Sequence, residues 1–284
     1  MNDCGGAKLR RLTESDLPAA LELSEQAGWN QTADDWRMLI DLAPEGCLAI
    51  EVEGELAATT TLLCYGRRLA WIGMVLTRKS YRGRGFARRL LTQALSLADQ
   101  MAIETVKLDA TDQGQPLYET MGFRSEQAVE RWTRPGTGGT TGTTDPVGER
   151  FTERATEREN WRTQDHRAFG ADRSDLLERL ARRGQAPFVI DGSYCLTRPG
   201  RYSHYLGPSV CNAPTTARAL IERALPTAGN RDCSWDLFPA NSSAAAMARD
   251  LAFTPTRRLQ RMVRGKDLHA NNDSIYAIAG FELG

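Results

Sequence analysis

The spacing of apolar and polar positions in the first 132 residues predicts a regular succession of helices and strands. Apolar residues recur at helical spacing after helix-start signals, and uninterrupted apolar runs bounded by turn residues predict strands. The predicted order is helices at 17–27 and 33–41, strands at 47–52, 56–64 and 69–76, a helix at 86–101, a strand at 105–109, a short helix at 115–121 and a last strand.

The pattern is interrupted at residues 133–148, TRPGTGGTTGTTDPVG, where Gly, Thr and Pro replace apolar residues. Such a composition is typical of a linker or a long surface loop. With 284 residues, the chain is long enough for two domains that each bury a core. The sequence therefore predicts a first lobe at 1–132, a linker at 133–148 and a second lobe at 149–284.

The second lobe partly repeats the first. GRRLAWIG at 66–73 matches GRYSHYLG at 200–207 with a constant offset of 134, and Gly122-Phe123 has a counterpart in Ala252-Phe253. The repeat favours two related lobes over two unrelated domains. We therefore predict an α/β (α+β) protein whose two lobes each contain a mixed, mostly antiparallel sheet flanked by helices.

Charge and composition limit the kinds of molecule that the protein is expected to bind. Lys plus Arg and Asp plus Glu both number 36, so no net field draws the chain to nucleic acid or to an anionic membrane. No apolar run has the length of a signal sequence or a membrane span, which predicts a cytoplasmic protein. Six scattered cysteines without C-x-x-C spacing and three distant histidines predict neither a metal site nor a disulfide framework.

The segment after the strand 69–76 carries the strongest chemical signal. Arg82-Gly83-Arg84-Gly85-Phe86-Ala87 forms a glycine-rich turn that opens an amphipathic helix. Glycines let backbone amides approach a ligand, and the free amides and dipole of a helix N-terminus favour phosphate, with Arg88 adding charge. The P-loop and the G-x-G-x-x-G spacings are both absent, so the predicted ligand is a pyrophosphate bound in another way.

This turn resembles the R/Q-x-x-G-x-G/A motif of the GNAT superfamily of acetyltransferases. About 25 residues further on, LDATDQGQPLYETMGF at 108–123 resembles the next block of that family, in which a short helix bearing a tyrosine precedes Gly-Phe. Thr111 and Gly114 depart from the Asn and Ala that are frequent there. The second half resembles the second lobe of two-lobed GNAT proteins, notably in Tyr205-Leu206-Gly207-Pro208.

The resemblance implies an acyl-CoA site in the first lobe, with acetyl-CoA or another acyl-CoA as donor and no metal. Tyr118 would protonate the departing CoA thiolate. The backbone at Met74 would pair with pantetheine and polarise the thioester carbonyl. The implied donor-binding residues are Met74, Val75, Leu76, Arg82, Gly83, Arg84, Gly85, Phe86, Ala87, Arg88 and Thr111.

The acceptor side is less defined by sequence. An amine must lose a proton before it attacks, and Asp109 is the best candidate base in the first lobe, although orienting the loop or binding substrate suits it equally. His204 and Asp236 are candidates in the second lobe, and a base acting through water is equally compatible. The predicted acceptor-binding residues are Trp29, Asn30, His204, Tyr205 and Asp236.

The second lobe lacks the paired glycines after its corresponding strand, and Ala248 stands in the place of Tyr118. We expect it to shape the acceptor pocket or to make a homodimer contact, without binding a second acyl-CoA. The predicted activity is transfer of an acyl group, most often acetyl, to the amine of a small molecule by direct attack in a ternary complex. The alternatives are a non-catalytic acyl-CoA sensor and a protein or peptide N-acetyltransferase.

Overall fold

The computed structural model describes residues 6–137, 155–266, 268 and 270–284. Each element predicted for the first lobe is present, within two residues of its predicted ends. A short strand, β1, precedes them and was not predicted, because its alternating basic residues are typical of an exposed edge strand. The first lobe contains β1 (Ala7–Arg11), α1 (Leu17–Gln26), α2 (Ala33–Leu42), β2 (Cys47–Val52), β3 (Glu55–Tyr65), β4 (Leu69–Thr77), α3 (Phe86–Gln100), β5 (Thr105–Ala110), α4 (Gln115–Glu119) and β6 (Arg124–Arg134).

The second lobe repeats this succession. Thr133 and Arg134 belong to β6, so the predicted linker starts two residues too early, and its part from 138 to 148 lies outside the described residues. The elements of this lobe are α5 (Ala155–Phe169), α6 (Ser174–Arg183), β7 (Phe188–Ile190), β8 (Ser193–Arg198), β9 (His204–Val210), α7 (Pro214–Ala224), β10 (Cys233–Leu237), α8 (Ser242–Asp250), β11 (Thr254–Gly265) and β12 (Ile275–Ala277).

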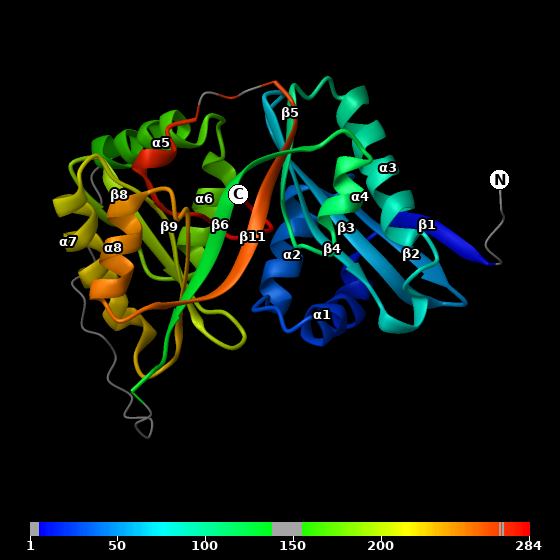
Figure 1. The fold of residues 1–284 in the computed structure, drawn as a ribbon, viewed down its shortest axis with the longest axis horizontal. Coiled ribbons are helices and arrows are strands. Elements are labelled where there is room, and N and C mark those ends of the chain that lie inside the picture. Colours follow the sequence, from blue (N-terminus) through cyan, green and yellow to red (C-terminus); the bar gives the residue numbers. More distant parts are fainter. Residues whose placement is uncertain (1–5, 138–154, 267, 269) are drawn as a thin grey trace.

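The two lobes share one sheet and exchange a strand. In the described chain the order is β1-β2-β3-β4-β5-β11-β6-β10-β9-β8-β7, and β12 pairs with β9. β11 of the second lobe lies between β5 and β6, and β6 of the first lobe lies between β11 and β10 (Figure 1). Only β4–β5 and β9–β10 are parallel among these pairs, which confirms the predicted mixed, mostly antiparallel class. The division at residue 132 therefore does not separate two independent sheets.

Two equivalent ion pairs join the exchanged strands to their new neighbours. Arg261 of β11 binds Asp109 of β5 through two hydrogen bonds of 2.8 and 2.9 Å. Arg131 of β6 binds Asp236 of β10 through two of 2.7 Å. In each case arginine and aspartate are directly opposite in the strand register. Bidentate arginine–carboxylate pairs fix geometry as well as charge, so they hold both exchanged strands in register.

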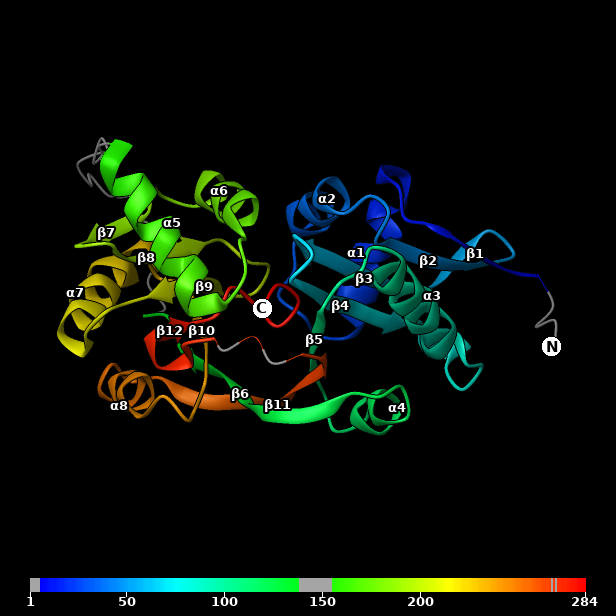
Figure 2. The ribbon, with the colours of Figure 1, turned by 90° about the horizontal axis from the view of Figure 1, so that it is seen from above.

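Helices cover both faces of the sheet (Figure 2). In the first lobe α3 packs on one face through residues such as Leu90 and Ala94, and α1 and α2 cover the other. In the second lobe α7 and α8 cover one face. A single apolar cluster joins α1 and α2 to α5 and α6 across the lobes, so the lobes bury a common core.

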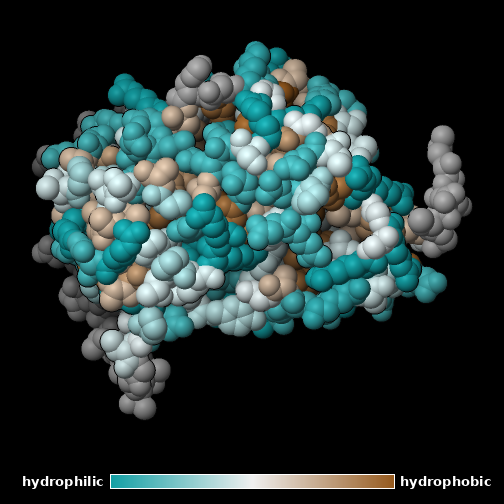
Figure 3. Space-filling view, viewed as in Figure 1, coloured by the Kyte–Doolittle hydropathy of each residue, from teal (hydrophilic) through white to brown (hydrophobic). Residues whose placement is uncertain are grey.

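Hydrophilic residues dominate the outer face drawn in Figure 3. Among the described residues, no helix combines the length and the apolar composition that crossing a bilayer requires.

Candidate active site

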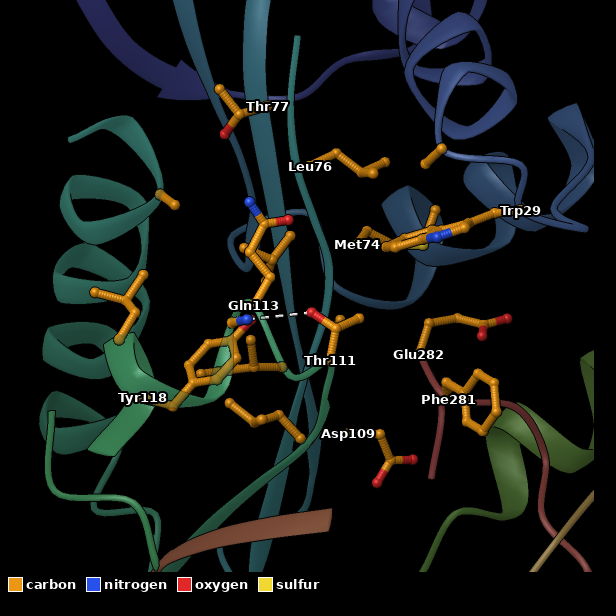
Figure 4. Close-up of a pocket in the computed structure, with 18 of the residues that line it drawn as sticks. Trp29, Met74, Leu76, Thr77, Asp109, Thr111, Gln113, Tyr118, Phe281 and Glu282 are labelled. Atoms are coloured by element: carbon orange, nitrogen blue, oxygen red, sulfur yellow. Dashed lines mark hydrogen bonds between the residues drawn. The ribbon is translucent and has the colours of Figure 1, made fainter. Parts of the chain in front are cut away.

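A cavity of about 650 Å³ opens between β4 and β5 and extends to the junction of the lobes (Figure 4). One end is formed by the glycine-rich turn and the first residues of α3. The other end is formed by β6, β11 and the segment that follows β12. The residues that line it include Trp29, Gln31, Met74, Val75, Leu76, Lys79, Arg82, Gly83, Gly85, Phe86, Ala87, Arg88, Asp109, Thr111, Tyr118, Arg131, Arg257, Phe281 and Glu282.

The cavity exists because β4 and β5 pair over only part of their length. Their parallel register ends at Trp71 opposite Lys107, and β4 continues to Thr77 without β5. β4 also bulges where Met74, with φ of 49°, and Val75 oppose a single residue of β3. A bulge leaves backbone groups outside the ladder and redirects the strand. Met74, Val75 and Leu76 thus line the cavity, where an extended amide-bearing chain could pair with them.

The glycine-rich turn presents open backbone to the same cavity. Gly83 and Gly85 have φ values of 78° and 77°, which disfavour any residue with a Cβ, and the space beside both is empty. Gly85 caps α3 without a side-chain hydrogen bond. The first amides of the helix therefore lack intrahelical acceptors and remain available for an anion.

Basic side chains surround this turn. Lys79, Arg82 and Arg88 line the cavity, and none forms an ion pair with a carboxylate in the described chain. Arg84 lies outside the lining, with its guanidinium 5.0 Å from the Tyr81 ring centre, contrary to its predicted place in the donor site. Arg89 donates to the Ala7 carbonyl at 3.0 Å. The three unpaired cations and the helix N-terminus make this end suited to a pyrophosphate.

Tyr118 forms the opposite wall and comes from α4. The turn before α4 is held by Thr111, whose hydroxyl accepts from the Gly114 amide at 3.2 Å (Figure 4). A Cβ at Gly114 would lie 3.0 Å from the Tyr118 ring, so glycine at this departure from the family pattern lets the ring pack closely. Burial raises the pKa of Tyr118 to about 12. Its hydroxyl therefore carries a proton at neutral pH.

The carboxylate of Asp109 is bound in an ion pair, whereas a general base needs a carboxylate that is free to accept a proton. Although Asp109 lines the cavity, its side chain is fully buried in the ion pair with Arg261. Burial raises the pKa of Asp109, and the Arg261 charge opposes that rise. Because taking a proton would leave Arg261 buried without its counter-charge, this geometry disfavours the predicted role as base and favours a structural one.

Residues 279–284 supply cavity residues that the sequence did not indicate. They lie between the lobes (Figure 2), where the Trp71 indole donates to the Phe281 carbonyl at 2.9 Å and the Tyr65 hydroxyl to the Leu283 carbonyl at 2.6 Å. A Cβ at Gly73 would lie 2.7 Å from the Glu282 carbonyl oxygen, so this glycine permits the contact. Phe281 and Glu282 thereby face the cavity beside the β4 bulge (Figure 4).

Of the two acceptor residues predicted in the α1–α2 loop, one lines the cavity and the other does not. Trp29 lines the cavity, with the guanidinium of Arg257 5.7 Å from its ring centre. Asn30 does not line it and instead bridges the lobes: its amide donates to the Ser203 carbonyl at 3.0 Å, and its oxygen accepts from the Tyr202 amide at 2.8 Å. Asn30 therefore fixes the second lobe against the loop that carries Trp29.

The predicted acceptor residues of the second lobe do not line this cavity. Asp236 is fully buried against Arg131 and accepts the Tyr205 hydroxyl at 2.8 Å. Tyr205 borders a small polar space that shares Gln31, Arg131 and Glu282 with the cavity. His204 contacts the Thr227 hydroxyl at 3.0 Å. Asp236 and Tyr205 thus belong to the packing between the lobes, where Arg131 is the member of their network that lines the cavity, whereas His204 packs within the second lobe.

His204 gives the fold a pH dependence. Burial, with a smaller effect of Arg231, lowers the pKa of His204 to about 4. The unfolded chain takes the proton near pH 6.5, so the free energy of unfolding should fall between pH 6.5 and 4, by about 3 kcal/mol. The measurement is the free energy of unfolding in urea at pH 7.5 and at pH 4. His204→Asn should no longer show the fall between these two pH values that is due to His204, whereas His166→Asn, at an exposed position, should still show it. An unchanged pH dependence in His204→Asn would contradict the assignment.

The equivalent region of the second lobe lacks these features. Ala248 is fully buried at the position of Tyr118, and the hydrogen bond from Phe253 to its carbonyl, at 2.9 Å, repeats the one from Phe123 to Tyr118, at 3.2 Å. α7 begins at Pro214 without a preceding glycine turn. The scaffold is repeated, but the glycine turn and the tyrosine are not.

Partly splayed parallel strands, a glycine turn at a helix N-terminus and a tyrosine on the facing wall define a transferase of the acyl-CoA type. Residues 9–123 match the acetyltransferase (GNAT) family, and residues 162–277 match an acetyltransferase (GNAT) domain. The chain belongs to the GNAT acetyltransferases and carries two GNAT domains, as the sequence motifs predicted.

Individual relatives agree with this assignment. The chain is 29% identical over 173 residues to an uncharacterized N-acetyltransferase, YitH, of Bacillus subtilis, a match that spans 61% of this chain and 60% of that protein. A putative acetyltransferase from Pyrococcus horikoshii shares the fold over 100% of this chain and 98% of its own, with a TM-score of 0.82 and 21% identity. A GCN5-related N-acetyltransferase from Sphaerobacter thermophilus also shares the fold, with a TM-score of 0.66 and 16% identity. The match covers 92% of this chain and 96% of that chain.

Proposed function

We propose that the chain is an N-acyltransferase that takes an acyl group, acetyl in the first instance, from acyl-CoA and transfers it to the amine of a small molecule. This proposal rests on one observation, which is that three features line the same cavity. These are the open glycine turn with unpaired cations, the unpaired β4 backbone and the buried Tyr118. Pyrophosphate, pantetheine and thioester would occupy them in that order.

The proposed reaction needs no protein nucleophile. The neutral amine nitrogen attacks the thioester carbonyl carbon, a C–N bond forms, and the C–S bond then breaks. Tyr118 gives its hydroxyl proton to the leaving thiolate, and the proton shed by the new amide nitrogen restores the tyrosine through solvent. Burial that raises the pKa of Tyr118 also raises the proton affinity of a thiolate released beside it, so the transfer stays feasible.

Several features favour a small acceptor over a peptide. The acceptor end is bounded by both lobes, by Trp29 from the first and by Arg257 and Phe281 from the second. A peptide substrate needs an open groove, whereas a pocket between domains suits a small ligand. The alternative of an acyl-CoA sensor without catalysis shares the donor site, and turnover separates the two.

The test is thiol release from acetyl-CoA over a panel of amines, combined with calorimetric titration of acetyl-CoA. We expect one acetyl-CoA bound per chain and thiol release that depends on the amine. Binding without release for any amine would support a sensor instead. Absence of acetyl-CoA binding by the folded protein would contradict the donor site.

A further inference from the structure

Arg257 of β11 lines the acceptor end of the cavity without an anionic partner. Its side chain forms no hydrogen bond or ion pair with the described residues of the chain. Its guanidinium instead lies 5.7 Å from the ring centres of both Trp29 and Phe281. Two aromatic rings shield the charge from water, which strengthens its attraction for an anion that enters the cavity.

The neighbouring arginines are satisfied. Arg131 is held by both oxygens of Asp236, and Arg261 by both oxygens of Asp109. Burial, followed by the charge of Arg131, lowers the pKa of Arg257, and the more weakly acting charges of Asp236 and Glu282 oppose that fall. An unpaired, half-buried arginine beside another cation is unfavourable for the fold, and a bound anion would relieve it.

A second group of polar atoms at this end suits a cation. The Glu282 carboxylate is buried and is hydrogen-bonded by the Gln31 side chain, whereas the Arg198 guanidinium is 3.9 Å away, longer than a charge-assisted hydrogen bond. Gln31 is 7% exposed and lines the same cavity, and its side-chain oxygen has no hydrogen-bond donor in the described part of the chain. A carboxylate and an amide oxygen together can accept the hydrogens of an ammonium group.

From these two groups we infer that the acceptor is an amine that also carries a carboxylate, which places it among amino acids and their small derivatives. The inference rests on the proposed acyl transfer and names its substrate class. Glu282 and Gln31 bind the ammonium group, and Arg257 binds the carboxylate.

The location of Glu282 agrees with this role. Its backbone packs on Gly73, the residue before the β4 bulge that lines the cavity with Met74. An ammonium held by the Glu282 carboxylate would therefore lie within the length of one side chain of the strand along which the thioester is proposed to lie. Burial raises the pKa of Glu282, so the carboxylate can also take the proton that the ammonium must lose before attack.

The test compares α-amino acids with the amines that lack only the α-carboxylate, such as phenylalanine with phenethylamine and leucine with isoamylamine, by thiol release from acetyl-CoA. The wild-type protein should prefer the amino acid of each pair. Arg257→Gln should raise the KM of the amino acid about 10- to 100-fold, as expected for a lost charge-assisted pair, and leave that of the amine unchanged. Glu282→Gln should lower kcat/KM for both members of a pair, because both carry the ammonium group.

Arg258→Gln is the matched control, since Arg258 is the next residue on β11, 69% exposed and paired with Glu130 at 3.0 Å. It should retain the wild-type preference. Equal use of both members of each pair, with Arg257→Gln like the wild type, would overturn the inference and leave acyl transfer standing. If the protein binds acetyl-CoA by calorimetry but acylates neither member of any pair, the inference falls, and the proposed activity falls with it only when the wider panel of amines also gives no thiol release.

Discussion

Replacing Gly85 with valine is expected to abolish acetyl-CoA binding. Gly85 has φ of 77°, and a β-branched residue in that conformation costs about 1–2 kcal/mol or more. The larger effect is steric and electrostatic: the valine side chain would project into the empty space beside the turn, where the phosphates approach the α3 amides. Calorimetric titration with acetyl-CoA should show no saturable binding, a loss of at least about 100-fold in affinity.

Gly54→Val provides the control for strain alone. Gly54 lies in the β2–β3 turn with φ of 84°, also beside empty space, and does not line the cavity. It should lose similar stability while binding acetyl-CoA normally. Stoichiometric binding by a folded Gly85→Val variant would show that the donor phosphates lie elsewhere.

Replacing Tyr118 with phenylalanine should lower kcat by about 10²- to 10⁴-fold, the usual range for loss of a general acid. The substitution keeps the ring, whose centre lies 6.1 Å from that of Phe123, and removes only the hydroxyl. Acetyl-CoA affinity should therefore change little. The measurement is pre-steady-state thiol release, under conditions in which the chemical step limits the rate.

Tyr202→Phe serves as the comparison, because Tyr202 is 55% exposed in the second lobe and does not line the cavity. It should behave as the wild type. An unchanged chemical rate in Tyr118→Phe would mean that water or another group protonates the thiolate.

The exchanged strands also explain why the first lobe is not a natural fragment. Residues 1–132 would lose β11, which pairs with β5 over six positions, and with it Arg257 and the partner of Asp109. They would also lose the segment that carries Phe281 and Glu282. The acceptor end therefore belongs to both lobes, although the donor end is built from the first alone.

The sequence predicted the glycine turn and the start of α3 well because their determinants are local. The periodicity of a helix or a strand depends only on residues that are close together in the sequence. Gly83, Gly85 and the start of α3 likewise form one contiguous segment. Positive φ at two glycines and free amides at a helix N-terminus follow from that segment alone. Tyr118 was indicated by its short distance from Gly122-Phe123 in the second motif.

The acceptor end could not be predicted in the same way, because its residues come from distant parts of the chain. Arg257 and Arg258 are adjacent and chemically alike, and only the register of β11 against β6 decides that the first faces the cavity and the second pairs with Glu130. Asp109 appeared free in sequence because its partner, Arg261, is 152 positions away. Thus local sequence determined the elements and the phosphate-binding turn, whereas strand exchange and long-range packing decided which charges remain unpaired.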